Sequence, residues 1–224
     1  MSRNYKEAPR EIETTYILEH AVQEHNSKLH TPESVTKYWQ TLWQVWEARA
    51  GLVIPVPNFP DTKEGLAEHE RKGDKVIYVP EDLSTQEDRY LLAKIWPEMG
   101  SYSTEKGNTV KNQISRSGYL YIETSVDAPN LNINEEELKE LFESQGREGM
   151  NLTEYIIGSQ DSKLISGRYF DEGSTVSSLL GSRRLARVVY ANFVPDGRLE
   201  AVSSIGRRNR NLNLGGRSVE VIKA

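Results

Sequence analysis

The sequence contains no cysteine, which excludes disulfide bonds, thiolate zinc sites, iron–sulfur clusters and thiol nucleophiles. It has no apolar run near the roughly 18 residues that a transmembrane helix needs, and its beginning lacks the apolar core of a secretion signal. Apolar residues make up 37% of the chain and charged residues 27%, within or close to the range of globular proteins. We therefore expect a folded chain without a membrane span, and its location stays open.

Motifs of catalysis and metal binding are also scarce. Histidine occurs four times, and His20 and His25 are five residues apart instead of the four of an HExxH zinc site. His69 lies between Glu68 and Glu70, and we interpret this run as a solvated helix. Neither GxSxG nor GxxxxGK[ST] occurs, so the sequence offers no nucleophile elbow and no phosphate-binding loop. We expect no enzyme, no metal site and no cofactor.

Acidic and basic residues are unevenly distributed. The chain has a formal net charge of −5. Residues 180–224 contain nine Lys or Arg against three Asp or Glu, a net charge of +6, so the preceding residues carry −11. A basic tail can bind polyanions, which makes nucleic acid a partner to weigh.

The first part of the chain carries mainly helix signals. We expect helices at 10–29, from Thr31, which can cap, to Gly51, which can end a helix, and between Ser84 and Pro97. Apolar residues recur at helical spacing in the second of these: Val35, Tyr38, Trp39, Leu42, Trp43, Val45 and Trp46. We interpret this stripe as a core face and not as a ligand site. Where the fold left it uncovered, it could form an oligomer contact.

The order of elements changes after a polar loop, and we place a domain boundary at residue 112. Residues 113–224 predict one strand, two helices capped by Asn134 and Asn151, and an irregular stretch rich in Gly and Ser at 167–184. Antiparallel strands follow, and Asp196-Gly197 predicts a hairpin with a primed turn. The layout is α+β, with a helix-rich region at 1–112.

Two short motifs accompany this order, "LLGSRR" at Leu179–Arg184 and "NLGGRSVEV" at Asn213–Val221. The order and the motifs together resemble the variable proteins of diversity-generating retroelements, which have a C-type-lectin fold. The resemblance covers about half of the chain and indicates an archaeal or viral member. It implies that reverse transcription copies a template repeat with errors at adenines and that the copies overwrite the end of the gene. Asn codons AAC and AAT then become codons for many residue types, on a face that binds varied ligands.

Composition offers one check of that implication. Replacing adenines in AAC or AAT cannot produce Lys, Glu, Gln, Met or Trp. The chain contains 51 residues of these types, so a stretch of 38 residues would hold about nine at average composition. From Ser182 to Val219 there is one, Glu200. Strands and turns are also poor in Lys, Glu and Gln, and this accounts for about half of the deficit.

Strand alternation selects the residues that would meet a ligand. In "RVVYANFV", Val189, Ala191 and Phe193 form one set, which we assign to the core, whereas Tyr190 and Asn192 point outward. We call the following twelve residues the predicted binding face: Arg184, Leu185, Tyr190, Asn192, Arg198, Ser204, Arg207, Arg208, Asn209, Arg210, Asn211 and Asn213. The expected partner is a protein or cell-surface ligand, and the resemblance implies display on a virion or cell.

Two alternatives stay open at this stage. The basic tail could bind nucleic acid, although it contains no RNP-like, zinc-finger or helix-turn-helix signature. A lectin-like fold could also bind calcium, but the tripeptides at 56–58 and 128–130 lack the Glu of the EPN motif, and few carboxylates precede the last strand. We expect no calcium site.

Overall fold

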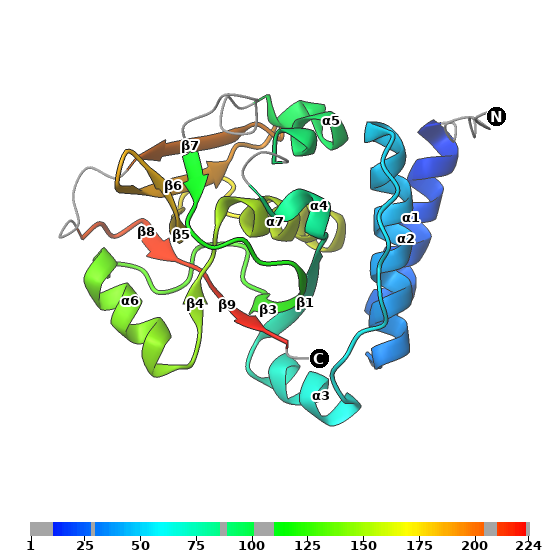
Figure 1. The fold of residues 1–224 in the computed structure, drawn as a ribbon, viewed down its shortest axis with the longest axis horizontal. Helices are drawn as coiled ribbons and strands as arrows, with labels where there is room; N and C mark the ends of the chain where they lie inside the picture. Colours follow the sequence, from blue (N-terminus) through cyan, green and yellow to red (C-terminus); the bar gives the residue numbers. More distant parts are fainter. Residues whose placement is uncertain (1–10, 28–29, 86–88, 101–109, 204–209, 223–224) are drawn as a thin grey trace.

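The computed structural model describes residues 11–27, 30–85, 89–100, 110–203 and 210–222, and within these ranges it is a mixed α+β structure (Figure 1). Its helices are α1 (Glu11–Ser27), α2 (Pro32–Ala50), α3 (Lys63–Arg71), α4 (Glu81–Ser84), α5 (Leu92–Ile95), α6 (Glu135–Ser144) and α7 (Leu152–Ser166), with short 3-10 turns at Arg89–Leu91 and Pro97–Met99. Its strands are β1 (Asp74–Val79), β2 (Val110–Asn112), β3 (Gly118–Glu123), β4 (Glu148–Gly149), β5 (Val176–Arg184), β6 (Arg187–Phe193), β7 (Leu199–Ser203), β8 (Leu214–Gly216) and β9 (Ser218–Val221). The predicted α+β class is confirmed.

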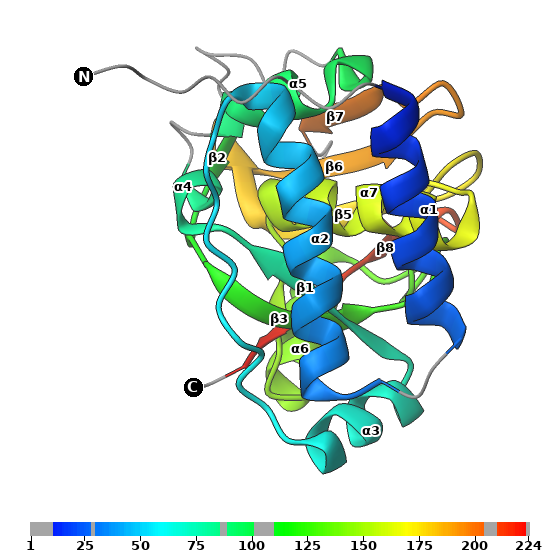
Figure 2. The same cartoon turned by 90° about the vertical axis from the view of Figure 1, so that its right-hand side faces the viewer.

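The strands form two sheets around a central helix. The first sheet has the order β1-β3-β9-β4 and is antiparallel throughout. The second has the order β2-β5-β6-β7, also antiparallel, and the short β8 pairs with β5 in parallel. Helix α7 contacts β1 of the first sheet and β5 of the second, and it is buried from Leu152 to Ser162. Helix α6 lies at the opposite end of the molecule from the α1–α2 pair (Figures 1 and 2).

The aromatic stripe of α2 is part of the core, as the sequence predicts. Thr31 accepts a hydrogen bond from the backbone N–H of Ser34 in a capping box, and Gly51 ends the helix with a φ of 68°. Trp39, Trp43 and Trp46 are each at most 2% exposed. Edge-to-face contacts between these indole rings suit aromatic packing. The stripe is covered within the chain and leaves no oligomer contact there.

The region expected to be helix-rich also supplies strands. Residues of β1 pair with β3 over a six-residue ladder, and β2 pairs with the end of β5. These ladders join the described residues on the two sides of position 112. The boundary at 112 stays a prediction.

Two local expectations for the second sheet are wrong. The stretch at 167–184 is not irregular over its whole length, because its second half forms β5, whose Ser177 and Ser178 are buried in the ladder. The β6–β7 hairpin forms, but its turn is not primed. The N–H of Gly197 donates to the carbonyl of Val194, and Gly197 alone has a positive φ (89°) in that turn. Pro195 explains this, because its ring fixes a negative φ that suits the first central residue of a type I turn.

Candidate ligand-binding face

Strand β6 separates core residues from outward residues as predicted. Ala191 and Phe193 are fully buried, whereas Tyr190 and Asn192 are partly exposed. One residue departs from the alternation, because Val188 shares the outward set yet is only 2% exposed. A β-bulge between Leu179 and Arg183 shifts the β5–β6 register at this point. The outward part of β6 therefore begins at Tyr190.

Strand β7 adds two residues that the sequence analysis missed. Val202 lies directly opposite Tyr190, and Glu200 lies opposite Asn192. Directly opposed residues point to the same side of a sheet, so these four form one surface, which we call the outer face of β6–β7. Val202 is 54% exposed. The alternation of "LEAVS", read together with the hairpin, could have identified both residues.

The first turn of α6 borders this outer face. Asn134 caps α6 by accepting hydrogen bonds from two backbone N–H groups, and glutamates follow it, which suits the positive end of the helix dipole. The Tyr190 hydroxyl lies 3.5 Å from Oε1 of Glu135. The guanidinium of Arg210 forms an ion pair with Glu137. Helix α6 therefore brings Tyr190 and Arg210, which are far apart in sequence, to the same helix terminus.

The predicted binding face is not a single compact patch. Arg184 is the last residue of β5 and Leu185 lies in the turn before β6, whereas Arg198 lies beyond the other end of β6, about 20 Å away at the rise of a strand. Arg198 is exposed and pairs with Asp196, and its backbone and side-chain hydrogen bonds lower the pKa of that carboxyl. Arg210, Asn211 and Asn213 are exposed in the segment before β8. Four members lie outside the described residues: Ser204, Arg207, Arg208 and Asn209.

Directly after the exposed residues 210–213, the backbone is tightly packed. Leu214, Gly215, Gly216 and Arg217 are buried. A Cβ built on Gly215 would lie 2.1 Å from the carbonyl oxygen of Pro129, so no other residue fits without a backbone shift. Residues 214–217 therefore form a buried segment, which we call the frame.

Arg217 is the centre of that frame. Its side chain is fully buried, with the guanidinium 3.8 Å from the ring centroid of Phe170. It donates to the carbonyls of Ser125 and Val126, each at 2.7 Å, and to Asp171 at 3.3 Å. A guanidinium presents five donors in a fixed plane, which suits several acceptors at once. Arg217 therefore joins the loop after β3 to the start of β9.

A cavity of about 630 Å³ lies beside the outer face, between α6, β4 and β5. Its lining includes Glu135, Phe142, Leu180, Gly181 and Arg183. Arg183 is held over it by hydrogen bonds to the carbonyls of Leu180 and Ser182. The lining combines charged side chains of both signs with apolar ones, which suits a ligand with both polar and apolar parts.

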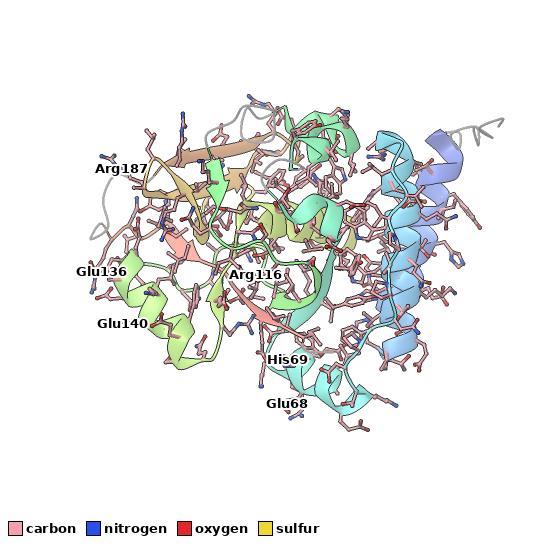
Figure 3. The ribbon with its side chains drawn as sticks, in the orientation of Figure 1. Glu68, His69, Arg116, Glu136, Glu140 and Arg187 are labelled. Carbon is pink, nitrogen blue, oxygen red and sulfur yellow. The ribbon has the colours of Figure 1, made fainter. Side chains whose placement is uncertain are left out.

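The run around His69 is helical, and Glu68 and Glu70 are exposed as predicted, but His69 itself is not solvated. His69 is 9% exposed, its ring stacks on Tyr121 at 3.6 Å, and its Nδ1 lies 3.0 Å from Asp74. Asp74 also accepts from Arg147. These contacts attach α3 to the first sheet. Glu68 and His69 are labelled in Figure 3.

The described residues contain no group of three or more His, Asp or Glu side chains arranged to hold a metal ion. Within the same ranges, no helix combines the length and the apolar character needed to cross a membrane. No family model, no curated protein and no solved structure matches this chain. The proposals below therefore rest on its own residues.

Matched substitutions on one strand test the two sides of this sheet. We expect Asn192→Ser on the outer face to change the free energy of unfolding by less than about 0.5 kcal/mol, as is usual for surface positions. Ala191→Ser places a hydroxyl at a fully buried site and should cost about 1–3 kcal/mol. Urea denaturation of both variants measures the difference. Equal costs would mean that Asn192 also has a packing role.

Proposed function

We propose that this chain is a ligand-binding protein, a variable protein of a diversity-generating retroelement, in which a C-type-lectin-like scaffold presents exchangeable side chains. The element order supports the scaffold. Strand β3 is followed by α6 and α7, with the two-residue strand β4 between these helices, and then by β5, β6 and β7. Strand β9 returns to pair with β3. This is the order that the resemblance implies for the C-terminal half.

One observation carries the ligand-binding role. The stretch that almost lacks Lys, Glu, Gln, Met and Trp contains, among its described residues, both fully buried and strongly exposed side chains. Ala191, Phe193 and Arg217 are fully buried, whereas Leu185 and Leu212 are 83% and 74% exposed. Leucine side chains this exposed bury little apolar surface and contribute almost nothing to the free energy of folding. Side chains that do not pack against the core can be exchanged without loss of the fold, and a receptor with a variable binding face needs such positions.

A library of variants tests this function. The library randomises the described members of the predicted binding face to the residue types reachable from AAC and AAT: Arg184, Leu185, Tyr190, Asn192, Arg198, Arg210, Asn211 and Asn213. A control library of the same type randomises five buried residues: Val189, Ala191, Phe193, Leu199 and Ala201. We expect most face variants, and almost no core variants, to resist protease when displayed on yeast. Equal survival of the two libraries would refute an exchangeable face.

The rival function is nucleic-acid binding by the basic tail. Its support is the net charge of +6 over residues 180–224. Binding of this kind weakens steeply with salt, because each neutralised phosphate releases counterions. A titration of arbitrary DNA at 50 and 200 mM salt separates the two functions. Tight binding at low salt, lost at least 100-fold at high salt, would favour the rival.

A further inference from the structure

The turn between β5 and β6 has residue types that do not suit its backbone. Arg184 pairs with Arg187 in the ladder, so Leu185 and Ala186 make up the whole turn. Both have positive φ, 55° and 68°. A two-residue hairpin turn of this kind favours Asn, Asp and Gly, because other L-residues clash with their own backbone there. The two residues therefore destabilise the turn that they form.

The side chain of Leu185 does not offset this cost by packing. It is 83% exposed, the most exposed large apolar residue of the two sheets. Burial of a leucine stabilises a fold, whereas a leucine at a hairpin tip stays in water. Leu185 instead presents an apolar side chain to the solvent at the tip of the hairpin.

Cations surround the same turn. Lys111 of β2 lies directly opposite Arg183 of β5, and Arg184 lies directly opposite Arg187. Because neighbouring residues of a strand point to opposite sides, the two pairs lie on the two sides of the sheet end. Figure 3 shows Arg187 at this end, on the same side of the molecule as Glu136 of α6.

A strained backbone, an exposed leucine and a cluster of cations thus coincide at one hairpin. Strained backbone that persists in a structure is often part of a functional site. We propose that the turn from Arg184 to Arg187 inserts into a protein partner whose surface carries carboxylates around an apolar socket. Leu185 fills the socket and the arginines pair with the carboxylates. This inference rests on the proposed ligand-binding function and adds the chemistry of the ligand.

The observations favour a protein over a nucleic acid. Phosphates would complement the cations, but a phosphate backbone offers no apolar socket for Leu185. A buried apolar anchor with charged residues around it is typical of protein interfaces. The positive charges would also speed the encounter with an acidic surface.

Peptide selection tests this chemistry. A phage library of random 16-residue peptides is selected on the immobilised full-length chain, and the enriched peptide is labelled for fluorescence anisotropy. We expect enriched peptides with Asp or Glu on both sides of Leu, Ile or Phe. The absence of any enriched peptide, or enrichment of peptides without acidic residues, would overturn the inference.

A variant with a relaxed turn separates binding from folding. The double substitution Leu185→Asn, Ala186→Gly installs residues that accept positive φ and removes the apolar group. We expect its thermal midpoint to rise by about 2–4 °C, because the new residues relieve the strain of the turn. Its affinity for the selected peptide should fall at least tenfold. Loss of affinity in a more stable protein cannot come from misfolding.

Charge variants complete the design. Arg187→Glu should lower the affinity for the selected peptide at least tenfold. The control Arg168→Glu removes an exposed arginine far from the turn and should change this affinity less than twofold. The outer-face variant Tyr190→Ser tests the proposed function itself. If it abolishes binding while the relaxed turn binds fully, the inference fails and the function stands. If the relaxed turn, Arg187→Glu and Tyr190→Ser all bind like the parent chain, both the inference and the proposed function fail.

Discussion

Replacing Arg217 by methionine should cost about 3–5 kcal/mol of the free energy of unfolding. The expected size follows from breaking a buried ion pair on one side, which leaves an uncompensated charge in the interior. Arg217 and Asp171 are both fully buried, and two backbone carbonyls lose their donor at the same time. Equilibrium unfolding in urea measures the loss.

The surroundings of Asp171 increase the stability lost when Arg217 is replaced. Its carboxylate also accepts hydrogen bonds from Tyr155, Thr175 and Ser177 at 2.6–2.9 Å. Burial, and then the charge of Asp171, raises the pKa of Tyr155, so this phenol stays protonated and remains a donor. Three neutral donors cannot replace the countercharge of the guanidinium.

Two further variants make the Arg217 result interpretable. Arg198→Met removes an exposed arginine with a carboxylate partner, Asp196, and should cost less than about 1 kcal/mol. Arg217→Lys keeps the charge but loses the planar fork, so we expect an intermediate cost. A loss below about 1 kcal/mol for Arg217→Met would contradict the role of this side chain as the centre of the frame.

The second large effect is a loss of stability in acid that depends on His25. Its ring is stacked between those of His30 and Tyr38, at 4.0 and 4.1 Å, and its Nδ1 is buried with no hydrogen-bond partner among the described residues. Burial, followed by the charge of His30, lowers the pKa of His25 to about 4. Lys75 acts in the same direction, and Asp161 opposes it.

The sign of the effect follows from proton binding. Between pH 6.5 and pH 4, His25 is protonated in the unfolded chain but stays neutral in the folded chain. The contribution of His25 to stability is therefore fully present above pH 6.5 and is lost as the pH decreases toward 4. The difference of about 2.5 pH units corresponds to about 3 kcal/mol.

His25→Phe isolates this contribution, because phenylalanine keeps a stacking ring and does not titrate. We expect the parent chain to lose about 3 kcal/mol more than the variant between pH 6.5 and pH 4. The carboxylates are protonated over the same pH range in both proteins, so their effect on stability cancels in the comparison. Parallel stability curves for the two proteins would contradict the assignment.

The sequence predicted best where a single residue type dictates local geometry. Thr31 and Gly51 mark the ends of α2, and Asn134 and Asn151 cap α6 and α7 as predicted, because a short polar side chain satisfies the N–H groups that a helix leaves open. The aromatic stripe of α2 also faces the core as its period requires.

The sequence failed where tertiary contacts overrule local preference. Serines and glycines suggested an irregular segment at 167–184, yet Ser177 donates to buried Asp171 and its strand is paired on both sides. The Leu185-Ala186 turn was not predicted either, because neither residue favours a positive φ. The outer-face residues Tyr190 and Asn192 were predicted from alternation alone, whereas their neighbour Glu135 could not be, since 55 residues separate it from Tyr190.

Sequencing the end of this gene across its source population, aligned with any near-copy repeat beside it, tests whether the binding face is diversified. A diversified face predicts differences confined to codons with adenine in the repeat and clustered between Arg184 and Asn213. The codons for the buried frame at 214–217 should stay constant. Differences spread evenly over the gene, with no repeat nearby, would contradict a diversified face.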